Sequence, residues 1–206
     1  MRIEIKDLSF SYNKRQPLLK NINLTLEEGD RLALVGPSGC GKSTFAQILA
    51  GNIRPNSGQI FIDGEPLSYK GFCPIQLIYQ HPEKAVNLRW KLQKTLTEAW
   101  DPNPEMLEAL GIENAWLNRY PAELSGGELQ RFCVARALAP QTRFIIADEI
   151  STMLDVITQA QVWQLLLSEL DRRHIGLLAI THSESLAARI CPQVIEFQRL
   201  NGKQGA

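Results

Sequence analysis

The sequence contains no long hydrophobic run. Its apolar stretches, such as residues 32–35 and 175–180, are far shorter than the ~18 residues that a membrane-spanning helix needs. Residues 1–6 alternate between apolar and charged side chains, so the continuous apolar core of a signal peptide is missing as well. We therefore expect a cytosolic protein without a transmembrane segment of its own.

An excess of positive charge is also absent. The 206 residues include 22 Lys and Arg against 22 Asp and Glu, which gives a formal net charge of zero. Proteins that bind DNA or RNA usually present a clearly basic surface, so no nucleic-acid partner is expected. The length and the 44% content of hydrophobic residues fit one globular domain with room for a smaller lobe.

Closely spaced cysteines are missing too. The four cysteines are Cys40, Cys73, Cys133 and Cys191, and none of them forms a CxxC pair of the kind that binds metals. Disulfides are rare in the cytosol. We therefore interpret all four as buried or incidental thiols.

The N-terminal part is predicted to be rich in strands. Alternation and turn residues favour strands at 2–5, 8–12, 22–26 and 32–35. Residues 43–50 have helical composition and end at Gly51, a typical residue after a helix end. Turn signals on both sides of residues 59–62 indicate a short strand in a hairpin.

The rest of the chain is predicted to hold a helical lobe followed by alternating helices and strands. Prolines and tryptophans concentrate over roughly residues 80–125, which favours short helices in a small inserted lobe. After it, helices and strands are expected to alternate at 127–138, 144–147, 156–170 and 177–180. Such alternation predicts an α/β fold with a parallel sheet covered by helices. Residues 201–206 are expected to be a frayed tail.

A glycine-rich segment follows the strand expected at 32–35 and fits the phosphate-binding pattern GxxxxGK[ST]. It consists of Gly36, Pro37, Ser38, Gly39, Cys40, Gly41, Lys42 and Ser43, and Thr44 completes the nucleotide-binding set. Glycines let backbone N–H groups curl around phosphate oxygens, and the next helix directs its N-terminal dipole at the same anion. Lys42 is expected to reach the β- and γ-phosphates, and Ser43 to bind Mg²⁺. The alternative, a plain glycine-rich turn, fits the strand and helix context less well.

Two acids, Asp148 and Glu149, follow the apolar strand at 144–147. Ligands of parallel sheets lie at the carboxyl ends of the strands, so both carboxylates are expected at the phosphate end. Asp148 is the expected Mg²⁺ ligand, and Glu149 is the expected general base that polarises the attacking water. An acidic pair after a strand is weak evidence alone, because helix N-termini favour acids anyway.

A second glycine-containing segment precedes the helix expected at 127–138. Its residues Ser125, Gly126, Gly127 and Glu128 follow Leu124 and lead into that helix, where a simple N-cap is the alternative interpretation. The segment resembles the LSGGQ signature of ATP-binding-cassette (ABC) ATPases, with Glu128 in place of the commoner Gln. Beside the phosphate-binding loop, this resemblance is the stronger interpretation.

Other positions match the ABC family in the family's order. Tyr12 matches the aromatic residue that stacks on adenine, and Gln80 matches the glutamine that contacts Mg²⁺ or water and faces the membrane partner. His182 matches the switch histidine, which is proposed to hold the γ-phosphate and the Glu149 region in register. Asp155 matches the D-loop that runs along the dimer interface. Taken alone, Tyr12 would more often be an ordinary strand residue, and a histidine such as His182 at a strand end is usually structural or solvent-exposed.

The resemblance implies a specific organisation. A P-loop core over residues 1–80 and 126–206, with an N-terminal antiparallel β-subdomain, would hold a helical signature subdomain at about 81–125. Each ATP, with its Mg²⁺, would lie between the P-loop of one subunit and the signature segment of another in a head-to-tail dimer. Two departures, Ile150 where proline is usual and Met153 where a small residue is usual, are expected to alter D-loop packing and not activity.

Residues 154–161 and 80–89 resemble the peptide and nickel importer branch, although Leu88 stands where that branch has proline, and many relatives carry a further C-terminal extension. The favoured hypothesis is an ATPase on the cytoplasmic face of the membrane that drives a separate permease through Gln80 and the helical lobe. An extracytoplasmic binding protein would deliver the cargo. The second ATPase would be either another copy or a sister subunit. The alternatives are a soluble ABC ATPase of an enzyme or nucleic-acid complex and a regulatory module without turnover, which Glu149 disfavours.

Overall fold

The structure is a computed structural model that describes residues 1–13, 17–152 and 154–202. The chain divides into two compact units. The first combines residues 1–77 and 143–148 with the segment that begins at His174, and the second combines residues 78–142 and 149–173. A boundary falls between Asp148, the predicted Mg²⁺ ligand, and Glu149, the predicted general base. No helix among the described residues is long and apolar enough to cross a bilayer.

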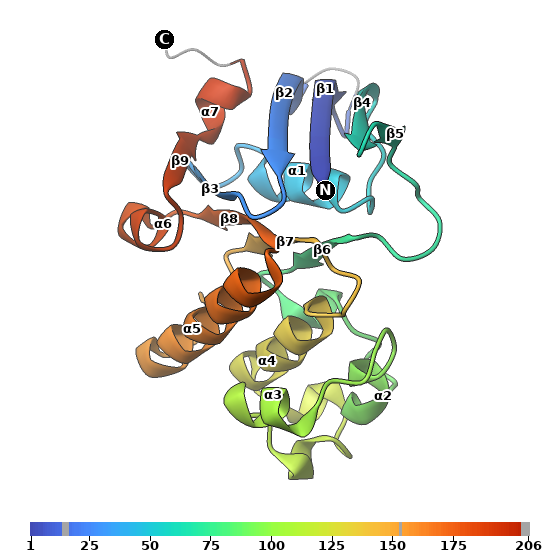
Figure 1. The fold of residues 1–206 in the computed structure, drawn as a ribbon, viewed down its shortest axis with the longest axis vertical. Helices are drawn as coiled ribbons and strands as arrows, with labels where there is room; N and C mark the ends of the chain where they lie inside the picture. Colours follow the sequence, from blue (N-terminus) through green and yellow to red (C-terminus); the bar gives the residue numbers. More distant parts are fainter. Residues whose placement is uncertain (14–16, 153, 203–206) are drawn as a thin grey trace. The chain divides into compact units, whose positions relative to one another are not determined.

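The first unit begins with an antiparallel sheet whose strands lie in the order β2-β1-β4-β5 (Figure 1). Its strands are β1 (Arg2–Phe10), β2 (Leu19–Glu27), β4 (Ser57–Ile62) and β5 (Glu65–Pro66). Residues 2–5 and 8–10 belong to the single strand β1, so the prediction of two separate strands is wrong. Asp7 has φ +50, and the register shifts between Ile5 and Leu8, so an irregularity within one strand produced the apparent break. The hairpin of β4 and β5 is confirmed.

A second sheet in this unit has the order β6-β7-β8-β3-β9, and its pairs β7–β8, β8–β3 and β3–β9 are parallel. Its strands are β3 (Arg31–Val35), β6 (Ile75–Ile78), β7 (Phe144–Asp148), β8 (Gly176–Thr181) and β9 (Gln193–Glu196). The unit also contains α1 (Lys42–Leu49), α6 (Glu184–Ile190) and α7 (Phe197–Leu200). The predicted parallel sheet is therefore confirmed.

The hydrophobic core of the first unit joins both sheets to α1. Phe45 of α1 and Phe197 of α7 are fully buried, and their ring centroids lie 5.7 Å apart. Burying a side chain of this size contributes about 1.5–3 kcal/mol. This packing fixes the start of α1, and with it the loop that precedes α1. Asn201, expected in a frayed tail, is instead buried and bonds Lys20 N and Leu18 O, because its side chain satisfies backbone groups near β2. Residues 203–206 lie outside the described residues.

The second unit is helical. It contains η1 (Pro82–Lys84), α2 (Leu92–Leu96), α3 (Pro104–Ala109), η2 (Asn114–Trp116), η3 (Pro121–Glu123), α4 (Gly126–Ala137) and α5 (Val156–Arg173). Arg131 of α4 donates to Leu110 O and to the hydroxyl of Thr158 on α5, so one guanidinium links three parts of the unit. Arg173 donates to Leu138 O just after α4, where a positive charge suits the helix dipole. Short helices were predicted here, and the structure contains them.

All cysteines in the described part of the chain are free thiols. Cys133 and Cys191 are buried, and Cys40 and Cys73 are half-buried. Burial raises the pKa of Cys133 to about 12 and that of Cys191 to about 11. Both thiols therefore stay protonated at neutral pH, which agrees with the interpretation of incidental thiols.

Candidate nucleotide site

The carboxyl ends of three neighbouring parallel strands bring the predicted phosphate-site residues of the first unit to one sheet edge. Val35, the last residue of β3, pairs with Thr181 at the end of β8, so the glycine-rich loop and His182 begin side by side. Asp148, the last residue of β7, pairs with Ile180 on the other side of β8. Loops at this edge of a parallel sheet are the usual ligand site of the fold.

The loop at 36–41 wraps around the side chain of Lys42. The lysine is 5% exposed, and its Nζ donates to Gly36 O at 2.7 Å and to Pro37 O at 2.9 Å. These carbonyls hold the ammonium inside the loop. Gly41 caps α1 with φ +111, and a Cβ there would lie 2.9 Å from Leu19 Cδ2, so a side chain would disturb both the turn and the packing.

Ser43 and Asp148 supply oxygen atoms at this edge. Ser43 lies in the first turn of α1 and is exposed, and Asp148 is 5% exposed at the end of a fully buried strand. Hydroxyl and carboxylate oxygens are the ligands that Mg²⁺ prefers. Both side chains therefore carry oxygen atoms of the kind that binds Mg²⁺, and Ser43 follows the glycine-rich loop closely in sequence.

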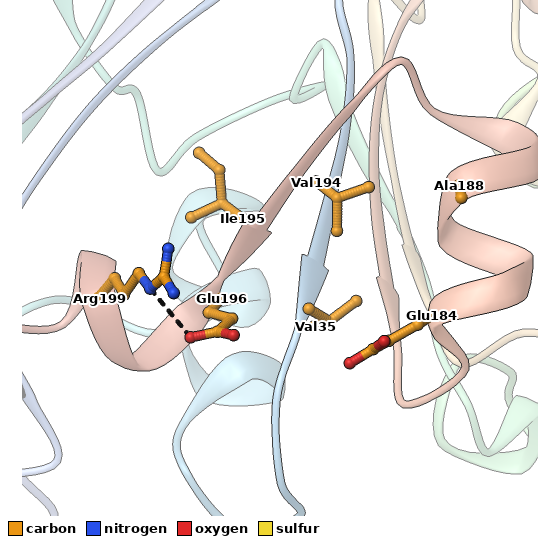
Figure 2. Close-up of a pocket in the computed structure, with 7 residues that line it drawn as sticks. All are labelled: Val35, Glu184, Ala188, Val194, Ile195, Glu196 and Arg199. Carbon is orange, nitrogen blue, oxygen red and sulfur yellow. Dashed lines mark ion pairs between the residues drawn. The ribbon is translucent and has the colours of Figure 1, made fainter. Parts of the chain in front are cut away.

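His182 is exposed and lines a cavity of about 380 Å³ together with Gly36 and Pro37. Glu184 and Glu196 also line this cavity, and both extend into a neighbouring cavity of about 580 Å³ beside β9 and α6 (Figure 2). Arg199 forms an ion pair with Glu196 at 3.0 Å, as Figure 2 shows. Both cavities are thus lined by carboxylates, which repel phosphate, so neither cavity by itself marks the ATP phosphate site.

Tyr12 stands just beyond β1 and is 65% exposed. Its ring meets the ring of Phe10 edge-on, with centroids 4.9 Å apart and an interplanar angle of 87°. Its hydroxyl lies 3.2 Å from Oγ1 of Thr44 on α1. An exposed aromatic ring attached to the phosphate-loop helix offers a flat face to a nucleotide base.

In the second unit, Gln80 and Glu149 are brought together. Gln80 Nε2 donates to Glu149 Oε2 at 3.1 Å across 69 positions of sequence. Glu149 adopts φ +48, an uncommon left-handed conformation for a residue with a side chain, and the N–H and hydroxyl of Thr152 donate to its carbonyl. Strained backbone of this kind is found disproportionately at functional sites.

Gln130 makes a contact next to Gln80 that the sequence motifs did not indicate. It lies on α4, is buried, and donates to Tyr79 O at 3.1 Å, directly before Gln80. The signature helix α4 thereby holds the backbone beside Gln80. A glutamine that falls among the buried apolar positions of an amphipathic helix is the signal that could have identified it.

The signature segment forms a reciprocal cap at the start of α4. Ser125 Oγ accepts from Glu128 N at 3.3 Å, and Glu128 Oε2 accepts from Ser125 N at 2.7 Å. The Ser125 N–H holds the pKa of Glu128 below its usual range, with help from the positive charges of Arg119 and Arg131. The N-cap interpretation of Ser125 is thus correct, and it leaves the hydroxyl proton of Ser125 available to donate.

The D-loop residue Asp155 caps α5. Its Oδ1 accepts from Thr158 N at 3.0 Å and from Ile157 N at 3.1 Å, and its pKa lies below the usual value chiefly because of its hydrogen bonds to Thr158. Ile150 is 1% exposed, so this departure from the family fills the hydrophobic interior. Met153 lies outside the described residues.

Comparisons with known proteins identify the family. The family model described as ABC transporter matches residues 19–152. The chain belongs to the ABC transporter family. A relative of this ABC chain is the nickel import ATP-binding protein NikE of Shigella dysenteriae, 36% identical over 94% of the chain and 82% of the relative. The nickel import system ATP-binding protein NikE of Staphylococcus aureus is 34% identical over 94% of the chain and 85% of the relative.

Solved ABC structures share the fold. The dimeric structure of MJ0796, a bacterial ABC transporter cassette, matches with a TM-score of 0.78 at 25% identity, over 94% of this chain and 93% of that one. CbiO1 of Clostridium perfringens, part of an ABC transporter complex, matches with a TM-score of 0.73 at 23% identity. The match covers 94% of this chain and 83% of CbiO1. The predicted ABC-type fold is confirmed, and this ABC chain is an ATPase whose hydrolysis is coupled to transport.

Proposed function

We propose that this ABC ATPase binds MgATP at the loop 36–44 and, as an ATP-driven dimer, powers a separate transmembrane permease that imports nickel or peptides. The observation that carries the proposal is the convergence of the glycine-rich loop, Asp148 and His182 at one edge of the parallel sheet. The resemblance to nickel import subunits of two bacteria supports the direction and the cargo.

Lys42 and the oxygen-bearing side chains have proposed roles toward the phosphates and Mg²⁺. The ammonium of Lys42, now held by Gly36 O and Pro37 O, would exchange these carbonyls for β- and γ-phosphate oxygens. Ser43, Asp148 and Gln80 would hold Mg²⁺ through oxygen atoms, directly or through water. When bound, the ion would supply charge neutralisation between the β- and γ-phosphates.

Glu149 is the proposed general base and His182 the proposed γ-phosphate contact. The hydrogen bond from Gln80 holds one carboxylate oxygen of Glu149 in place, and the carboxylate would orient the attacking water molecule. Gln80 therefore touches the general base and also lies in the segment that faces the permease in this family. We infer that docking of the permease reaches the reaction through this bond.

Ser125, Gly126, Gly127 and Glu128 are proposed to contact the ATP of a second subunit, and Asp155 to run along the dimer interface. The cap between Ser125 and Glu128 keeps the serine hydroxyl at the N-terminus of α4, where the helix dipole favours an anion. The second ATPase is either another copy or a sister subunit. The two units together would form one ABC ATPase domain over residues 1–206.

The chain is proposed to lie on the cytoplasmic face of the membrane, bound to its permease, with an extracytoplasmic binding protein that delivers cargo. Cells without the chain should regain uptake of radioactive nickel, or of a labelled peptide, when the wild type is supplied. Glu65→Gln, which removes an exposed carboxylate on β5, is the matched control and should restore uptake equally. Glu149→Gln should not restore it, and uptake with that variant would contradict ATP hydrolysis by Glu149 as the power source.

A further inference from the structure

Tyr12 is held in place by the phosphate-loop helix. Its ring is largely exposed, yet Phe10 meets one side edge-on, and the hydroxyl bonds Thr44 Oγ1 at 3.2 Å. Phe10 and Thr44 are both buried and belong to regular elements, β1 and α1. The ring therefore has one aromatic contact and one hydrogen bond at its tip, and most of its surface remains exposed.

Thr44 is well suited to hold the tip of this ring. It is the third residue of α1, directly after Lys42 and Ser43. A threonine side chain in a helix is largely confined to two χ1 rotamers, so its Oγ1 has few positions available. The position of the Tyr12 ring is consequently tied to the helix whose N-terminus would bind phosphate.

We propose that Thr44 is a positioning residue for the base of the nucleotide, because its hydroxyl orients the Tyr12 ring on which adenine stacks. The inference rests on the proposed function, in which Tyr12 stacks on adenine. A ring that is already oriented loses less conformational entropy when the base binds. Thr44 belongs to the predicted nucleotide-binding set, whereas this contact gives it a specific role in base recognition.

The test separates base binding from phosphate binding. The dissociation constants of ATP and of inorganic tripolyphosphate, which has no base, are measured by calorimetry on the full chain. The tripolyphosphate constant divided by the ATP constant is the ratio that reports the contribution of the nucleoside. Thr44→Val removes the hydroxyl at nearly constant volume and should lower this ratio about two- to tenfold, the cost of ordering one side chain. Thr44→Ser keeps the hydroxyl and should retain the wild-type ratio.

A double-mutant cycle identifies the partner of Thr44. Tyr12→Phe removes the other end of the bond and should lower the ratio by the same factor, and the double variant should lower it no further. An unchanged ratio in Thr44→Val, or additive losses in the double variant, would overturn the inference.

Failure of the proposed stacking is distinguishable from failure of this inference. Tyr12→Ala removes the ring itself and should reduce the ratio more than Thr44→Val does, since base stacking contributes ~1–3 kcal/mol, or about five- to 150-fold. If Tyr12→Ala leaves the ratio unchanged, the adenine site is elsewhere and the proposed role of Tyr12 fails. If Tyr12→Ala lowers the ratio and Thr44→Val does not, the positioning role alone is overturned.

Discussion

The carboxylate of Glu128, which stands where most ABC signatures have glutamine, is predicted to act through the helix cap. It accepts the N–H of Ser125 at 2.7 Å, while Ser125 Oγ accepts the N–H of Glu128. Caps of this kind contribute about 0.5–2 kcal/mol. Glu128→Ala should therefore lower the free energy of unfolding by about 1 kcal/mol, which corresponds to a melting temperature ~2–4 °C lower in a chain of this size.

Glu128→Gln is the informative companion variant. A glutamine keeps a carbonyl oxygen that can accept the Ser125 N–H, so most of the stability at pH 7 should remain. Glu105→Ala is the matched control, because Glu105 is an exposed first-turn acid of α3 where Asn103 makes the cap. This control should change the melting temperature less than Glu128→Ala does.

The pH dependence follows from the lowered pKa of Glu128. The charged form is favoured in the folded state, so its contribution is fully present above the unfolded pKa of glutamate, about 4.3. This contribution to stability is lost as the pH falls through the lower pKa that Glu128 has in the folded state. The wild type should therefore lose stability relative to Glu128→Gln only in acid, as thermal unfolding between pH 3 and 7 would measure.

The functional readout is the ATPase rate of the assembled dimer. Glu128→Ala should reduce it because Ser125 loses its restraint, and Glu128→Gln should stay close to the wild type. Equal rates and equal melting temperatures for the Ala variant and the wild type would refute the capping account. If Glu128→Ala and Glu128→Gln lose the same share of the ATPase rate, the negative charge of Glu128, and not the cap, would be the feature that activity needs.

Three further predictions concern the active site and the fold. Glu149→Gln should bind ATP and dimerise but hardly turn over, and normal turnover measured by phosphate release would rule out Glu149 as the general base. Lys42→Ala should weaken nucleotide binding itself, and an unchanged ATP affinity by calorimetry would count against the phosphate-loop assignment. Gly58→Ala should destabilise by more than ~2 kcal/mol in chemical denaturation, because φ is +83 and the Cβ would lie 2.5 Å from Asp7 O; a near-neutral result would contradict that packing.

The sequence was sufficient to predict the elements whose pattern is local and strong. The strand before the glycine-rich loop, the helix α1 and the strand that ends at Asp148 were predicted to within one residue at each end. Each is a continuous apolar run or a helix bounded by glycine. Few alternative structures compete for segments of this kind, so local composition is enough to predict their secondary structure.

Other elements depend on partners that are distant in sequence. The short strand β9 has mostly exposed residues and forms by pairing with β3, more than 150 positions earlier in the chain. The helices α6 and α7 flank it and are equally short. The sequence pattern did not indicate them, because four to seven residues carry too little periodicity to outweigh non-local pairing.

Motifs located the candidate site residues, but their contacts could not be read from spacing. The bond between Gln80 and Glu149 and the bond between Gln130 and Tyr79 join positions more than fifty residues apart. The cap of Ser125 and Glu128 could have been predicted from the sequence, because a serine followed three residues later by glutamate is the capping-box pattern. Ser125 was considered as a simple N-cap, but the reciprocal hydrogen bond from Ser125 N–H to the Glu128 side chain was not predicted.

The most direct test of the transport role is affinity purification of tagged Glu149→Gln from native membranes with ATP present. The variant should trap the ATP-bound assembly, and a multi-spanning permease, alone or with a sister ATPase, should co-purify with it. The gene neighbourhood of that permease would then point to the binding protein and its cargo. Recovery of soluble enzymes or nucleic acid without any membrane protein would contradict the account and favour an ABC ATPase outside transport.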